Sequence, residues 1–184
     1  GALISKLVER AVKGGLVVED LYRLGDEGLL NLLGDRYAPR DAVLGRLLGD
    51  LRARRLPKRA YVLTRRVGDA LQEDLIARFH RDPAQREGLE AELERDLGLE
   101  PGEVIIYCPA RGMAQKEARV RVEVGDGEVV SLADLELREV EDLLEKHQDL
   151  WKFYVFVSAR HDAARARLAA LCEERFGVPS ELSF

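Results

Sequence analysis

A cluster of positive charges occupies one region in the first half of the sequence. From Arg36 to Arg66 there are ten basic and two acidic residues, a local balance of +8, whereas the whole chain carries −5. The densest part runs from Arg52 to Arg59 and holds five cations. Guanidinium forks and a flexible ammonium group held close together suit the oxygens of a polyphosphate. The cluster therefore indicates a site for a phosphorylated ligand.

A cluster of cations does not always form a ligand site. A run of cations can be a solvated helix face, or it can be neutralised by carboxylates elsewhere in an acidic chain. The acidic stretches Glu87–Asp96 and Glu136–Glu145 offer such carboxylates. Binding of nucleic acid is less favoured, because the net charge is negative and no aromatic-rich strand interleaves with the cations.

Motifs for catalysis are missing. The sequence has no glycine-rich phosphate or dinucleotide loop, no C-x-x-C and no H-E-x-x-H. The histidines His80, His147 and His161 are scattered singly. His161 and Asp162 form the adjacent pair used in some metal sites, but such a site needs a later Asp and none follows. We expect Asp162 to cap the last helix, and we expect no catalytic residue, metal ligand or cofactor in this chain.

The elements around the cluster predict an α+β fold. Apolar residues at steps of three and four predict helices in the first 56 residues, the last of them with Pro39 at its first position and ended by Pro57. We expect residues 1–58 to form a helical segment and residues 59–184 a small mixed or antiparallel sheet lobe flanked by helices. Strands are predicted at 60–64, 104–108, 118–124 and 151–157, a hairpin turn at 125–127, and helices at 68–80, 83–97, 137–147 and 162–176.

The composition indicates the cellular compartment and whether the sequence is part of a longer protein. Cys108 and Cys172 lie in apolar stretches, which favours buried thiols in a reducing cytoplasm over a disulfide. The apolar runs are too short to cross a membrane. The only methionine is Met113, and Gly1 opens directly onto a helical pattern, so we expect a piece of a longer protein.

The same region carries a family resemblance. Leu21–Glu27, the helix Leu44–Leu51 and the run Arg54–Val62 resemble the region just after the catalytic core of HD-domain phosphohydrolases, in the group akin to deoxynucleoside triphosphate triphosphohydrolases. The strand ending at Tyr107-Cys108-Pro109, the hairpin 121–130 and the strand Tyr154–Val157 are similar too. Pro57 replaces the family's usual aromatic residue, and Gly25 replaces the first acid of its D-D pair.

This resemblance implies a site and a set of partners. In regulated members, the Arg and Lys of an R-x-L-x-K segment contact the phosphates of an activating nucleotide at a subunit interface. The matching residues here are Arg54 and Lys58, with Arg55 and Arg59 as helpers. The resemblance also implies a homo-oligomer, a deoxynucleoside triphosphate or GTP as ligand, and an HD core with a divalent metal, preceding Gly1.

The sequence thus predicts the regulatory or oligomerisation portion of an HD-family nucleotide phosphohydrolase. Two alternatives remain. The chain can be a structural assembly module that binds no ligand, or the basic segment can be a strip that binds nucleic acid.

Overall fold

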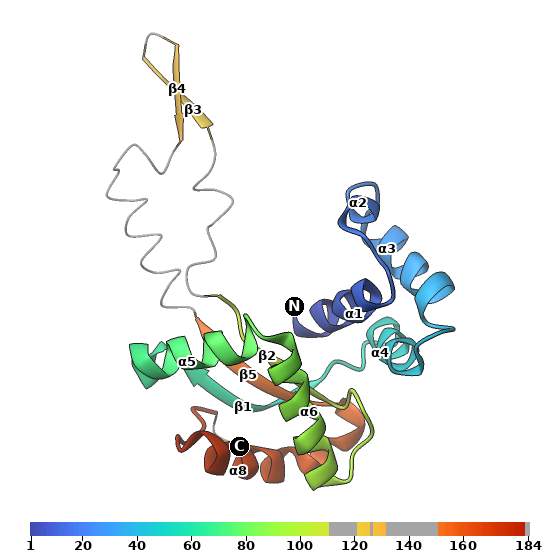
Figure 1. The fold of residues 1–184 in the computed structure, drawn as a ribbon, viewed down its shortest axis with the longest axis vertical. Coiled ribbons are helices and arrows are strands. Elements are labelled where there is room, and N and C mark those ends of the chain that lie inside the picture. The colour runs from blue at the N-terminus through green and yellow to red at the C-terminus, as the bar shows by residue number, and fades with distance from the viewer. Residues whose placement is uncertain (111–120, 126, 132–150, 183–184) are drawn as a thin grey trace.

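The computed structural model describes residues 1–110, 121–125, 127–131 and 151–182. Its N-terminal helices gather beside a three-stranded sheet whose other face carries further helices (Figure 1). This arrangement confirms the α+β fold class. The N-terminal elements are α1 (Ala2–Lys13), α2 (Val18–Leu21), α3 (Asp26–Leu32), a π-helical turn (Leu33–Tyr37) and α4 (Ala42–Arg52).

The main sheet is antiparallel, with strand β5 in the middle. The order is β1-β5-β2, and the strands are β1 (Lys58–Thr64), β2 (Val104–Tyr107) and β5 (Lys152–Val157). A separate antiparallel hairpin pairs β3 (Arg121–Val124) with β4 (Glu128–Ser131), as the turn at 125–127 predicted. The predicted helix 137–147 and the acidic stretch Glu136–Glu145 lie outside the described residues.

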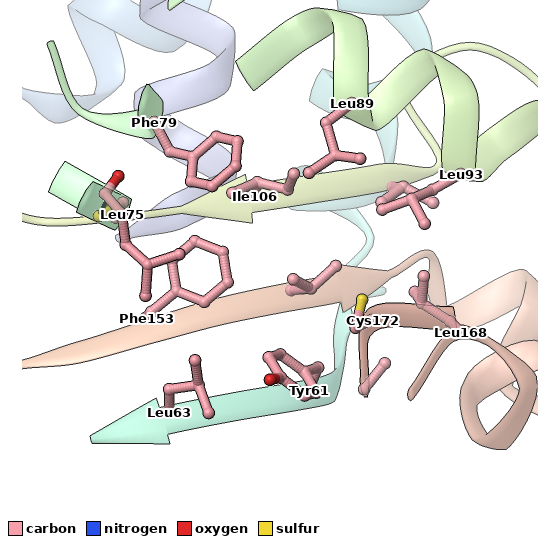
Figure 2. Packing of buried hydrophobic residues seen from close by; sticks show 14 of the residues in the cluster. Tyr61, Leu63, Leu75, Phe79, Leu89, Leu93, Ile106, Phe153, Leu168 and Cys172 are labelled. Carbon is pink, nitrogen blue, oxygen red and sulfur yellow. Dashed lines mark hydrogen bonds between the residues drawn. The ribbon is translucent and has the colours of Figure 1, made fainter. Parts of the chain in front are cut away.

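Alternation along β5 sorts its side chains onto two faces. Phe153, Val155 and Val157 are fully buried, whereas the residues between them are partly exposed. On the buried face Phe153 meets Phe79, with ring centroids 5.6 Å apart, and Figure 2 shows Ile106 beside them. The helices that supply this core are α5 (Asp69–Phe79), α6 (Pro83–Leu97) and α8 (Arg165–Phe176).

The other face of the sheet is covered in part by the N-terminal helices. Ile105 of β2 belongs to the same buried cluster as Leu7 of α1, Leu33 of the π-helical turn and Leu44 of α4. Apolar burial of this kind contributes about 25 cal/mol per Å² of surface removed from water. The short N-terminal helices are thus held by packing against one another and against the sheet.

Ion pairs fasten α1 to α6. Lys6 pairs with Glu90, and both side chains are buried. Burial raises the pKa of Glu90, and the ammonium of Lys6 opposes that rise. Nearer the surface, Arg86 Nη2 lies 2.7 Å from Glu9 Oε2. These contacts join residues from both sides of the predicted boundary at residue 58.

Both edges of the main sheet are closed by side chains and by the C-terminal tail. On the β1 side, the Val62 N–H donates to Ser180 Oγ at 3.2 Å, and the Glu181 N–H donates to the Val62 carbonyl at 2.9 Å. On the β2 side, the Val104 N–H donates to Glu94 Oε1 at 3.0 Å. The Ile106 N–H likewise donates to Glu90 Oε1 at 2.8 Å.

Two predicted helix starts are wrong. Helix α4 begins at Ala42 and not at Pro39, because the Asp41 carboxylate accepts the Leu44 N–H and thereby caps the helix. The last α-helix begins at Arg165, after a 3₁₀ turn (Ala159–Ala164) that contains Asp162 and is capped by Ser158. Asp162 instead lies 3.6 Å from the Arg165 guanidinium.

The two cysteines form no disulfide with each other. Both thiols are free and buried, and burial raises the pKa of each to about 12. They are therefore protonated at neutral pH. Within the described ranges, no helix is both long and apolar enough to cross a membrane.

We predict that Lys6→Met destabilises the protein by about 3 kcal/mol, because it leaves the buried carboxylate of Glu90 without its cation. Urea unfolding measures this change. The control is Lys13→Met, which breaks the more exposed pair with Glu87 and should cost less than about 1 kcal/mol. Equal losses of stability in both variants would show that the buried pair of Lys6 and Glu90 stabilises the protein no more than the exposed pair does.

A second prediction concerns how the stability of the protein changes at acidic pH. Partial burial raises the pKa of Asp41, but hydrogen bonds from Arg10 and from the Leu44 N–H outweigh it, so the pKa lies below its ordinary value. A lowered folded-state pKa stabilises the protein above the unfolded value and stops doing so as pH falls through the folded value. Asp41→Asn keeps the cap and should cost about 1 kcal/mol at pH 7. Unfolding at pH 7 and pH 3 should show that this cost shrinks in acid.

Candidate functional site

The basic segment lies where the last N-terminal helix meets the sheet. Helix α4 ends at Arg52, and the chain turns before β1 begins at Lys58. Arg54 adopts φ 55°, in the left-handed region that residues with a side chain rarely occupy. The Arg55 N–H donates to the Asp50 carbonyl at 2.8 Å and closes the turn. The predicted site residues thus span the turn, from Arg54 and Arg55 after α4 to Lys58 and Arg59 at the start of β1.

The buried carboxylate of Asp50 holds this turn in place. Asp50 is 5% exposed, and its Oδ1 accepts hydrogen bonds from Arg55 Nε at 2.9 Å and Arg160 Nη2 at 2.6 Å. Arg160 comes from the 3₁₀ turn that follows β5. One carboxylate therefore ties the end of α4 to the end of the central strand. Two guanidinium groups compensate its charge, as a buried carboxylate requires.

The remaining predicted site residues have no anionic partner in the described part of the chain. Arg54, Lys58 and Arg59 are all exposed, and no side-chain hydrogen bond or ion pair involves them there. The acidic residues of α6 instead pair with Lys6, Lys13 and Arg175, among others. These three cations are thus available to an anion, although the register of β1 places Lys58 beside Val157 and Arg59 beside Phe156, on opposite faces of the sheet.

An apolar pocket of about 330 Å³ has Arg59 in its wall. Tyr154 and Phe156 lie on the outer face of β5, with ring centroids 5.4 Å apart and ring planes 31° apart. The register places Tyr107 opposite Tyr154 and Arg59 opposite Phe156. The pocket lining comprises Gly1, Ala2, Leu3, Leu56, Pro57, Arg59, Tyr107, Tyr154 and Phe156.

This aromatic face was not predicted from the sequence. The inference that no aromatic strand accompanies the cations is wrong, because pairing of β5 with β1 and β2 brings distant residues beside Arg59. The alternation of Tyr154 and Phe156 along β5 was the available signal. Recognising its importance required the strand order, which the residue pattern does not specify.

The adjacent pair His161 and Asp162 does not gather metal ligands. His161 Nε2 lies 2.9 Å from Glu103 Oε2, and Asp162 lies beside Arg165. Among the residues that the structure describes, no group of three or more His, Cys, Asp or Glu side chains could hold a metal ion.

Comparison with known proteins supplies the family. A family model described as "HD associated region" matches residues 1–181, nearly the whole chain. The chain belongs to this family. As an HD-associated region it has an accessory role to HD-domain proteins, and an HD domain is its partner. No curated protein and no solved structure matches the chain.

The backbone of Arg54 generates a prediction for this HD-associated region. A left-handed conformation costs a residue with a side chain about 1 kcal/mol, and glycine avoids the cost. Arg54→Gly should therefore raise the free energy of unfolding by about 1 kcal/mol. The control is Arg54→Ala, which removes the same charge and keeps the strained backbone. If both variants unfold at the same urea concentration, charge repulsion and not backbone strain governs this position.

A further prediction concerns the Asp50 anchor. Asp50→Asn keeps the shape but removes the charge that two arginines share, so it should destabilise the protein by about 2 kcal/mol. Trypsin should then cut faster after Arg54 and Arg55. Asp74→Asn, at an exposed pair with Arg78, is the control and should change stability by less than about 0.5 kcal/mol. An unchanged cleavage rate would contradict the anchoring role.

Proposed function

We propose that this HD-associated region is the regulatory portion of an HD-family nucleotide phosphohydrolase and binds the phosphates of a deoxynucleoside triphosphate or GTP. The observation that carries the proposal is the set of exposed cations Arg54, Lys58 and Arg59, which have no anionic partner among the described residues, together with the aromatic pocket that Arg59 lines. Arg and Lys supply charge-assisted hydrogen bonds to phosphate oxygens. The metal of such an enzyme would belong to the HD domain, together with its catalytic residues.

The geometry suggests which part of a nucleotide the cations would bind and which part the aromatic pocket would bind. Arg59 lies in the pocket wall, so a bound nucleotide can place its base toward Tyr154 and its phosphates on Arg59, with Arg54 and Lys58 adding positive charge in the same segment. Aromatic rings stack on bases regardless of their identity. Arg55 has a different task in this proposal, because its guanidinium already bonds to Asp50. It holds the turn that presents its neighbours.

A subunit interface would complete the site. The start of α1, the turn before β1 and all three strands of the main sheet contribute to the wall of the pocket. We infer that a second subunit of a homo-oligomer covers the ligand, and that binding thereby favours assembly. An assembly that forms only with nucleotide would explain why these cations stay exposed in one chain.

Titration calorimetry tests the proposal. Arg54→Ala/Lys58→Ala should weaken binding of a deoxynucleoside triphosphate or GTP by about 100-fold at low salt with magnesium, because two charge-assisted contacts are lost. The matched control removes two exposed cations outside the cluster Arg36 to Arg66, Arg23→Ala/Arg95→Ala, and should change affinity by less than about threefold.

Two results would contradict nucleotide binding. One is the absence of heat with any of these nucleotides, both for this chain and for the protein joined to its HD domain. The other is an equal loss in the test and control variants. An affinity that falls steeply with salt for single-stranded oligonucleotides, and exceeds that for mononucleotides, would support the nucleic-acid-binding alternative.

An assembly module without ligand is the second candidate. It is favoured by large apolar side chains that are exposed on the first two helices, between them and just after them: Ile4, Val12, Val17 and Val18 are 44–56% exposed, and Tyr22 is 85% exposed. Exposed apolar groups gathered in one segment mark contact surfaces. If Arg54→Ala/Lys58→Ala abolishes oligomers when no nucleotide is present, as measured by light scattering, the assembly role is primary.

A further inference from the structure

The 3₁₀ turn that follows β5 is attached to two other parts of the fold. Ser158 caps the start of this turn, and its hydroxyl oxygen accepts the Arg160 N–H. The Arg160 guanidinium bonds to the carboxylate of Asp50 near the end of α4. The imidazole of the next residue, His161, contacts the carboxylate of Glu103 just before β2. Two adjacent residues of one short turn therefore hold the end of α4 and the start of β2.

The attachment to Glu103 is buried and includes the main chain. Glu103 is 5% exposed, and its Oε2 lies 2.9 Å from His161 Nε2. The Ser158 N–H donates to the Glu103 carbonyl at 2.8 Å. The Glu103 carboxylate also accepts the Glu100 N–H at 2.9 Å, which fixes the carboxylate in its own loop. The 3₁₀ turn is thus held at the start of β2 by a side chain and by the backbone.

The loop before β2 packs closely on α4 as well. The Arg46 guanidinium of α4 donates to the Pro101 carbonyl. Gly102 has φ 84°, and a Cβ at this position would collide with Val43 of α4. Glycine permits both this backbone conformation and this close approach. The loop is therefore held against α4 and against the 3₁₀ turn, and the 3₁₀ turn is held against the end of α4.

We propose that Arg160 is a positioning residue for the nucleotide site, because its guanidinium fixes the carboxylate of Asp50 and Asp50 holds the turn through Arg55. This inference rests on the proposed function. Binding groups must be held within about 0.5 Å of the productive geometry, and residues behind them provide that restraint. Arg160 affects the affinity for the nucleotide without touching it, and His161 supports Arg160 by holding the 3₁₀ turn on Glu103.

Titration calorimetry with GTP, at low salt with magnesium, measures this role in the full chain. Arg160→Gln should weaken binding about tenfold, because the nearly buried Asp50 loses a charged donor and holds Arg55 less firmly. Arg160→Lys should remain within about threefold of the unaltered chain, since an ammonium group can make the single contact with Asp50.

The matched control is Arg167→Gln. Arg167 is an exposed arginine of α8, and its guanidinium donates to the Asp96 carbonyl at 3.0 Å. This substitution makes the same change in net charge and should alter the affinity for GTP less than about twofold.

The Asp50→Ala background separates positioning from a direct contact with the ligand. Substitutions of residues that act through one another have non-additive effects. When Asp50→Ala is already present, Arg160→Gln should weaken GTP binding by less than a further factor of about two. A direct contact of Arg160 with the phosphates would persist in this background, so a further tenfold loss there would overturn the positioning role.

Hydrogen exchange at the Arg55 amide reports on the turn without any ligand. This N–H donates to the Asp50 carbonyl at 2.8 Å. Arg160→Gln should speed its exchange about tenfold, and His161→Ala about threefold, because the turn opens more often. His161→Gln keeps an N–H donor for Glu103 and should exchange like the unaltered chain. Unchanged exchange in Arg160→Gln contradicts the inference.

The results also distinguish this inference from the proposed function. If the unaltered chain binds GTP and Arg160→Gln binds it equally well, or loses no more affinity than Arg167→Gln, only the positioning role fails. If the unaltered chain gives no heat, both alone and joined to its HD domain, nucleotide binding fails and the role of Arg160 in it fails too. Circular dichroism verifies that each variant is folded, and Asp50→Asn replaces Asp50→Ala if the latter does not fold.

Discussion

The buried charge of Asp50 is the constraint on which the candidate site depends. A carboxylate closed off from water needs cations or donors around it, and here Arg55 and Arg160 meet that need. Arg55 turns inward to this carboxylate, whereas Arg54 takes the left-handed conformation that ends α4 and is exposed to solvent. Asp50 therefore determines which cations of the segment have a structural role and which are available to a ligand. It also fixes the distance between α4 and the end of β5.

Where local rules dominate, the sequence predicts the fold well. Helix α6 follows its predicted bounds because Asp82 caps it, Pro83 opens it and Gly98 closes it in a left-handed conformation. The predicted start of α4 was wrong because Pro39 and Asp41 are both signals for a helix start. Asp41 caps the helix, and its carboxylate bonds both to the Leu44 N–H and to Arg10. That choice depends on α1, which no local pattern describes.

The candidate site is predictable only in part. The charge count locates the basic segment, but it cannot tell Arg55 from Arg54, since both are arginines in the same turn. The difference comes from Asp50 beneath the turn and from Arg160, far along the chain. The aromatic face arises in the same way, from strand pairing between distant residues.

The closed edges of the sheet determine how copies of this chain can join. An open edge strand would recruit a strand from another molecule, productively or as an aggregate. Here Ser180 and Glu181 occupy the β1 side, and the carboxylates of Glu90 and Glu94 occupy backbone donors of β2. A continuous sheet across two copies would have to displace these groups first. Contacts through helices, turns and sheet faces require no such displacement.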